Sequence, residues 1–118
     1  MSKKIIKPIH IYNKTYQHNY YVYYGVPFDK YLEHFEIQAG FPEEISPDSS
    51  SAGRCATIES LEDGVMTFIW TKDKDISILA HEVLHAVSMT LSMKDIPFNE
   101  SSEEAYAYLL SMIIREIV

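Results

Sequence analysis

Residues 76–93 read ISILAHEVLHAVSMTLSM and contain the pattern His-x-x-x-His at His81 and His85, with Glu82 directly after the first histidine. Apolar residues recur every three or four positions through this stretch, which predicts a helix over about Ile76–Met93. Residues four apart share one face of a helix. The two imidazoles are therefore expected to point the same way from consecutive turns.

This spacing suits a metal ion. Two neutral imidazole nitrogens on adjacent turns can bind one tetrahedral zinc ion at roughly 2.0–2.1 Å each. Glu82 lies on the same turn, offset so that its carboxylate is expected to reach a metal-bound water rather than the metal. A carboxylate there can take a proton from that water, as the general base of metal-assisted hydrolysis does. The opposing interpretation is a buried helix with two hydrogen-bonded core histidines.

The distribution of residues around the helix separates these interpretations. At 100° per residue, one broad side collects the aliphatic residues Ile76, Leu79, Val83, Ala86 and Val87. His81 and His85 fall on the opposite side, together with Ser77, Ser88 and Ser92. Core histidines would be expected among the aliphatic residues, so this arrangement favours an exposed metal site.

A catalytic zinc site has three protein ligands and an open water position. The carboxylates that follow the helix are Asp95, Glu100, Glu103 and Glu104. We expect Glu104 to be the third ligand, because the neighbouring alanines would let a second helix approach closely; Glu103 is the substitute. The alternative is a capping box, in which Ser101 caps a helix and Glu104 reaches back to it.

The rest of the sequence predicts an α+β fold, with a small, mostly antiparallel sheet packed on the helix over Ile76–Met93 and on a C-terminal helix. The expected strands are Ile5–Tyr12, His18–Tyr24, Arg54–Ser60 and Val65–Thr71, and the other expected helices are Asp29–Ile37 and about Ser102–Ile117. Expected connections are turns at Asn13-Lys14 and Asp63-Gly64, a loop over Gly40–Gly53, and a helix cap at Asp73 or Asp75.

Length, charge and cysteine content limit the classes of function that the chain can have. The 118 residues suit one domain, 1–118, and the net charge of -7 argues against a nucleic-acid partner. Cys55 is alone, so no internal disulfide forms, and a small buried hydrophobe is its expected role. No apolar segment suits a signal peptide or a membrane span, so a cytoplasmic protein without a membrane partner is expected.

The run His81-Glu82-Val83-Leu84-His85-Ala86-Val87, followed by Glu104-Ala105-Tyr106-Ala107-Tyr108, resembles the gluzincin arrangement of the zincin metallopeptidases. It also looks like the small zincin-like proteins that phages and prophages encode. The resemblance covers roughly residues 54–118. It implies a minimal zincin-like domain with Zn²⁺ held by His81, His85 and Glu104, and Glu82 as general base and proton shuttle.

The resemblance also implies a peptide or protein substrate, laid by strand addition along an edge strand at Val65–Thr71. Gluzincins often place an aspartate four residues after the glutamate ligand, and this chain has Tyr108 there. A hydroxyl orients an imidazole less strongly than a carboxylate does. Tyr108 and the tyrosines Tyr20, Tyr21, Tyr23 and Tyr24 are candidate transition-state donors, although strand packing explains most of them.

Three functions follow from these patterns. The first is a zinc-dependent metallopeptidase. The second is a zincin-fold protein that binds metal and a partner with little or no hydrolysis, which a chain of 118 residues favours because it leaves little room for a deep cleft. The third is a structural domain without metal. Glu82 favours the first function over the second, because a purely structural zinc site would not need it.

Overall fold

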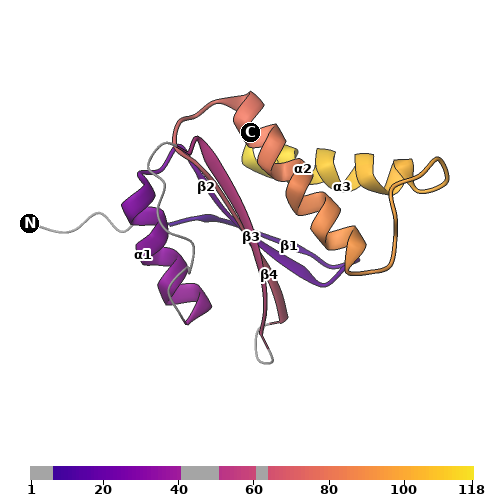
Figure 1. The fold of residues 1–118 in the computed structure, drawn as a ribbon, viewed down its shortest axis with the longest axis horizontal. Helices are drawn as coiled ribbons and strands as arrows, with labels where there is room; N and C mark the ends of the chain where they lie inside the picture. The colour runs from indigo at the N-terminus through magenta and orange to yellow at the C-terminus, as the bar shows by residue number, and fades with distance from the viewer. Residues whose placement is uncertain (1–6, 41–50, 61–63) are drawn as a thin grey trace, which may run out of the picture.

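The computed structural model describes residues 7–40, 51–60 and 64–118. Its strands are β1 (Ile9–Asn13), β2 (His18–Tyr24), β3 (Gly53–Ser60) and β4 (Gly64–Thr71), and its helices are α1 (Phe28–Ala39), α2 (Ile76–Ser92) and α3 (Glu103–Ile117) (Figure 1). The fold belongs to the α+β class expected from the sequence. No helix of the described residues is long and apolar enough to cross a membrane.

The four strands form one sheet in the order β1-β2-β4-β3. The two outer pairings are antiparallel, whereas β2 and β4 are parallel. The expectation that Val65–Thr71 is an edge strand is therefore wrong, because β4 lies between β2 and β3. The reason is the long connection through α1: the chain passes to the outer position first, as β3, and then returns beside β2 as β4.

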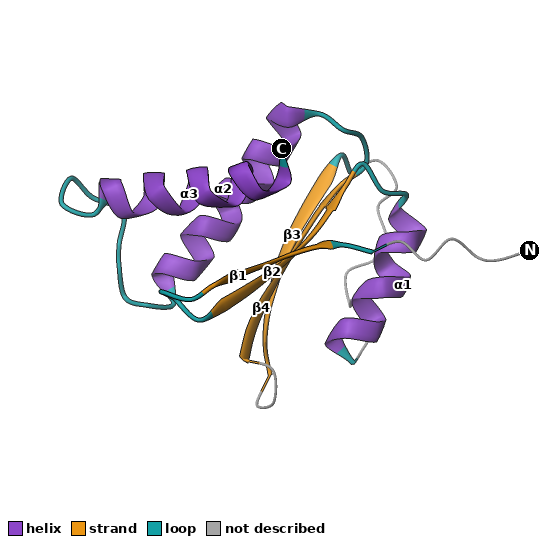
Figure 2. Cartoon of the chain, turned by 180° about the vertical axis from the view of Figure 1, so that it is seen from behind, coloured by secondary structure: helices purple, strands orange, loops and turns teal. Residues whose placement is uncertain are grey.

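Helices cover both faces of the sheet (Figure 2). Alternation along β4 places Ile69 in the core beneath α2 and α3, and Phe68 and Trp70 in the core beneath α1. Successive side chains of a strand point to opposite faces, so β4 contributes to both cores. The indole of Trp70 donates a hydrogen bond to the carbonyl of Val26 at 2.6 Å, which satisfies its buried N–H.

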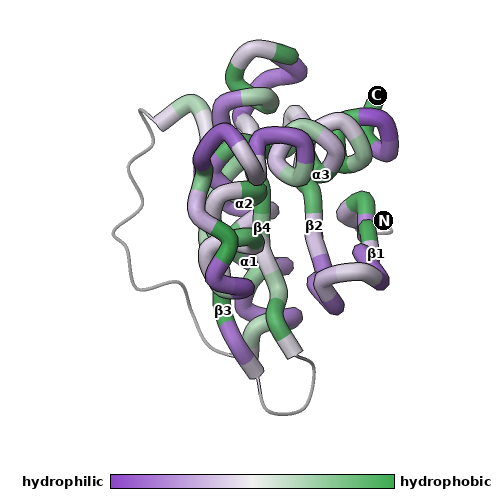
Figure 3. The backbone as a smooth tube through the Cα atoms, turned by 90° about the vertical axis from the view of Figure 1, so that its right-hand side faces the viewer, coloured by the Kyte–Doolittle hydropathy of each residue, from purple (hydrophilic) through white to green (hydrophobic). Residues whose placement is uncertain are grey.

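The core beneath α2 and α3 positions the helix that carries the paired histidines. Leu79, Val83, Ala86 and Val87 are fully buried, as expected, and the hydroxyls of Tyr20 on β2 and Thr90 lie 2.6 Å apart. Ile76 was expected in this core and is 52% exposed, because the first turn of α2 projects beyond the buried part of the helix. In Figure 3, hydrophobic and hydrophilic segments alternate along α2 and α3, as expected of helices with one buried face.

The element boundaries agree closely with the expectations, with one larger difference at the N-terminus. β1 begins at Ile9 rather than Ile5 and extends to Asn13; residues 5 and 6 lie outside the described part. Pro8 precedes the strand, and proline has no N–H to donate to a partner. Most of the expected loop, 41–50, and the hairpin residues 61–63 also lie outside the described part of the chain. Gly64, which follows the hairpin, has the positive φ of 76° that a tight turn favours.

The helix caps settle two expectations. Asp75 caps α2, since its carboxylate accepts from the N–H groups of Ser77 and Ile78 at 2.9 and 3.4 Å. The capping box at the start of α3 does not form. Ser102 is the N-cap residue, and no side chain caps the helix.

Candidate metal centre

His81 and His85 lie on consecutive turns of α2 and are both exposed. Their Nε2 atoms are 3.2 Å apart, and the rings meet edge to face with their centroids 4.8 Å apart. Two ligands of a tetrahedral zinc ion with bonds of about 2.0–2.1 Å are separated by about 3.3–3.4 Å. The imidazole pair is therefore already at the spacing that one metal ion requires. A direct N–H···N hydrogen bond between the rings also fits this distance.

The exposure of the pair follows from the helix period. The buried stripe of α2 runs through Leu79, Val83 and Ala86, which face the sheet. His81 and His85 lie on the opposite side of this stripe, as the sequence predicts, and no aliphatic core residue separates them from solvent. Leu84, between them in sequence, is also 52% exposed.

Glu82 lies at the border between the buried and the exposed faces of α2, with 9% of its surface exposed. Burial raises the pKa of its carboxyl group above the usual value, because the charged form loses solvation there. His81, His85 and Arg54 act in the opposite direction, since their positive charges favour the carboxylate. A carboxylate with a raised pKa beside two imidazoles is a strong candidate for a general base.

A hollow of about 340 Å³ opens beside this carboxylate. One wall is formed by Ser51 and Ala52, which precede β3, and by Gly53, its first residue. The other wall is α2, at Ser77, Ile78, His81 and Glu82. Apart from His81 and Glu82, the lining side chains are small or uncharged. The hollow thus gives a ligand access to the face that carries the imidazole and the carboxylate.

β3 is an edge of the sheet, and within the described ranges it pairs with β4 alone. The N–H of Lys72 donates to the carbonyl of Ala52 at 2.9 Å, one position before the pair Gly53 and Thr71. Hydrogen-bonded and non-hydrogen-bonded pairs alternate along an antiparallel ladder. The backbone N–H and C=O groups of Gly53 and Cys55 therefore point away from β4, toward the open edge beside α2.

Glu104 is exposed in the first turn of α3 and is not brought to the imidazole pair. Figure 1 shows this first turn extending to the right, beyond α2. Across the residues that the structure describes, no group of three His, Cys, Asp or Glu side chains is placed to hold a metal ion. Glu103 lies in the same exposed turn. The structure therefore assembles two of the expected ligands and the expected base.

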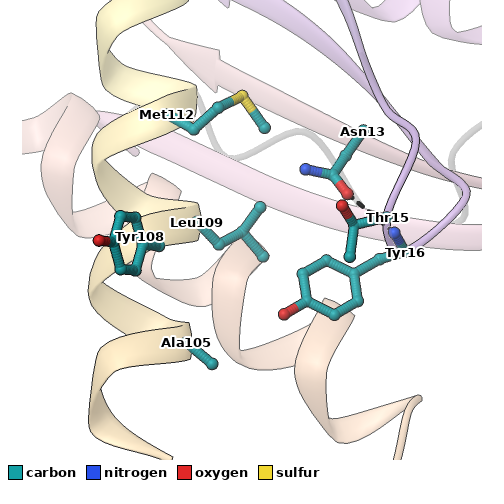
Figure 4. Close-up of a pocket in the computed structure, with 7 residues that line it drawn as sticks. All are labelled: Asn13, Thr15, Tyr16, Ala105, Tyr108, Leu109 and Met112. Atoms are coloured by element: carbon teal, nitrogen blue, oxygen red, sulfur yellow. Dashed lines mark hydrogen bonds between the residues drawn. The ribbon is translucent and has the colours of Figure 1, made fainter.

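Tyr108 lies away from this centre. It lines a separate groove between α3 and the turn that joins β1 to β2, together with Asn13, Tyr16 and Met112 (Figure 4). Its side chain is 72% exposed. Of the other candidate donors, Tyr20 and Tyr23 are buried in the two cores, which confirms strand packing as their role.

Two residues near Glu82 were not singled out for this site by their sequence pattern. Gly53 was expected to end a loop. It instead begins β3, at a point where an added Cβ atom would meet Glu82. A glycine at the start of a strand often marks a close backbone approach, which is the signal that could have found it. Cys55 packs against the core beneath α2, and burial together with Glu82 raises the pKa of its thiol to about 12. It is therefore a packing residue, as expected.

No protein-family model, curated protein or solved structure matches the chain.

Proposed function

We propose that the protein is a zinc-dependent metallopeptidase in which His81 and His85 bind the ion and Glu82 is the general base. The observation that carries this proposal is the pair of Nε2 atoms, 3.2 Å apart on an exposed helix face, beside a carboxylate with a raised pKa. A structural zinc site would require neither the carboxylate nor the adjoining hollow.

The roles of the side chains follow from their positions. Zinc, when bound, would make a coordinated water molecule more acidic and polarise the substrate carbonyl. The Glu82 carboxylate would accept the proton of the attacking water and pass it to the leaving amine. Its low exposure supports this role, because a poorly solvated carboxylate is more basic than one in water.

We further propose that an extended peptide adds to the outer edge of β3, which pairs with no further strand among the described residues, rather than to β4. The outward-facing backbone groups of Gly53 and Cys55 can pair with a substrate strand, and Gly53 adjoins Glu82 directly. Strand addition supplies main-chain hydrogen bonds that are independent of the substrate's sequence. The hollow beside His81 would then receive a substrate side chain.

Glu104 remains the first candidate for the third protein ligand, and Glu103 the second. Because the described residues gather no third ligand, either side chain would reach the ion only if the first turn of α3 approached α2. Zinc titration of Glu104→Ala tests this. A weaker affinity would support Glu104, and an unchanged affinity would move the assignment to Glu103→Ala.

The proposal as a whole is tested by metal analysis and by cleavage of a diverse peptide library. We expect about one zinc ion per chain, lost in the double variant His81→Ala/His85→Ala and retained in His10→Ala, which removes an exposed histidine elsewhere. Glu82→Gln should keep the zinc and lose the cleavage, because an amide cannot accept the proton. Zinc-loaded native protein that cleaves no library member would overturn the peptidase proposal.

A second candidate is a protein that binds a metal ion and a partner without hydrolysis. The observation that favours it is the absence of a third metal-ligating side chain beside the pair in residues 7–40, 51–60 and 64–118. Zinc binding that survives in both Glu104→Ala and Glu103→Ala, together with an absence of cleavage, would favour this function.

A further inference from the structure

Gly53 is a glycine whose own backbone does not require one. The glycines with positive φ are Gly25, Gly40 and Gly64, at 69°, 83° and 76°. Those conformations are ones that side chains rarely adopt, whereas Gly53 lies in a regular strand, paired with Thr71. The reason for a glycine at this position must therefore lie in its surroundings.

The surroundings leave too little room for a side chain unless a neighbouring side chain moves. A Cβ atom on Gly53 would lie 3.0 Å from both Cγ and Oε2 of Glu82, and 3.0 Å from Cγ2 of Ile78. Carbon atoms at optimal contact are about 3.5–4.0 Å apart. A single added methyl group would therefore have to displace either Ile78 or Glu82.

Glu82 is the residue that would move. Ile78 is branched at Cβ, which restricts its rotamer in a helix and keeps its Cγ2 atom in place. The side chain of Glu82 has more rotatable bonds, and its carboxylate lies at the border of the exposed face. Glu82 is 9% exposed, so its carboxylate can yield only toward the exposed face, and a methyl group on residue 53 would push it outward from the wall of the hollow.

We propose that Gly53 is a positioning residue for Glu82: its missing side chain provides the space that holds the carboxylate beside the imidazole pair. This inference rests on the proposed function, because it assigns the placement of the base in that reaction. Gly53 itself contributes space and an outward-facing backbone, and Glu82 remains the group that handles the proton.

The test compares Gly53→Ala with Ala56→Ser, which adds one heavy atom to the same strand on its α1 side, away from Glu82. Gly53→Ala should lower kcat by up to about tenfold, because a shift of a few tenths of an ångström is expected and a misplacement of roughly 1 Å can cost about a hundredfold. Zinc affinity should stay within about twofold of native, because the imidazoles do not move. KM should change less than kcat, because the outward-facing backbone groups of residue 53 are retained. Ala56→Ser should keep the native kcat. A native kcat in Gly53→Ala would overturn the positioning role and leave the proposed function intact.

A double-mutant cycle gives a measurement that needs no activity. Gly53→Ala should lower the midpoint of urea unfolding in the native background. In the Glu82→Ala background, Gly53→Ala should lower the urea midpoint less, because the Cγ and Oε2 atoms of residue 82 are no longer present. Equal losses in both backgrounds would show that the contact does not constrain Glu82, and would overturn the proposal whatever the activity. Native protein that is zinc-loaded and inactive would instead overturn the proposed function.

Discussion

The buried polar residues of the core beneath α2 are arranged as a connected cluster rather than as isolated groups. His18, at the start of β2, is 1% exposed, and its Nε2 hydrogen-bonds with the hydroxyl of Thr67. That hydroxyl also lies 2.8 Å from the hydroxyl of Thr57, which donates to the sulfur of Met89 on α2. Burial, and secondarily the positive charge of Lys94, lowers the pKa of His18 to about 4. The histidine is therefore neutral in the folded protein at pH 7.

This burial predicts a loss of stability in mild acid. Between pH 6.5 and about 4 the unfolded chain binds a proton at residue 18 that the folded chain does not bind. The free energy of unfolding should therefore fall as the pH drops through this window, by up to about 3 kcal/mol. Urea unfolding at pH 7 and pH 5 measures it. His18→Gln, which can still hydrogen-bond with Thr67, should show a smaller loss; an equal loss would assign the effect to other groups.

Among the elements, α2 carries the two imidazoles and Glu82, so its first turns determine the geometry of the centre. Those turns are held by Asp75, whose carboxylate also accepts from the hydroxyl of Ser77 at 2.6 Å. The last turn is held by α3 and by the connection before it, where the hydroxyl of Tyr106 donates to the carbonyl of Ile96 at 2.6 Å. The imidazole pair thus lies between a capped end and a packed end.

Removal of the cap should loosen this helix at the end nearer the imidazole pair. Asp75→Ala leaves the first N–H groups of α2 without their side-chain acceptor, and it should lower the thermal midpoint by a few degrees. Asp75→Asn keeps an acceptor oxygen and should recover most of the loss. Thermal unfolding followed by circular dichroism compares them. Asp75→Asn as unstable as Asp75→Ala would show that charge, not capping, is what matters.

Local patterns predicted the helices and strands, and the shared location of His81, Glu82 and His85 on α2. β2 has the predicted bounds, and β3, β4, α2 and α3 differ from theirs by one residue at one end, because apolar periodicity and capping residues lie within each segment. The placement of His81, Glu82 and His85 depends on the helix period alone, so it too was predictable. The position of Glu104 depends on how α3 crosses α2, and the approach of Gly53 depends on how β3 meets α2. The crossing of α3 leaves no local signal, and the approach of β3 to α2 leaves only the glycine itself.

At the scale of the whole molecule, β4 joins two cores. Its inward residues on one face pack beneath α2 and α3, and those on the other pack beneath α1. The alternation that produces this division is local and follows from the pleat of a strand. The sequence did not predict the strand order, since a hairpin signal pairs β3 with β4 without stating which of them lies beside β2. An interior β4 means that neither core can lose its packing without exposing the other.

This shared strand predicts a single unfolding transition. Trp70 is the chain's one tryptophan and lies in the core beneath α1, so its fluorescence reports on that core. Far-ultraviolet circular dichroism reports largely on α2 and α3, the two longest helices. The two signals should give the same urea midpoint. A lower midpoint for the fluorescence would contradict the prediction and show that the α1 layer unfolds first.

The exposed placement of His81 and His85 also bears on which divalent ions the pair could bind. Two exposed imidazoles on adjacent helical turns bind Ni²⁺ and Cu²⁺ as well as Zn²⁺, and copper more tightly, as the Irving–Williams order describes. Selectivity would then come from the supply of each ion where the chain folds. Protein that is purified over a nickel column would be expected to retain Ni²⁺ at this pair, whatever ion was bound before.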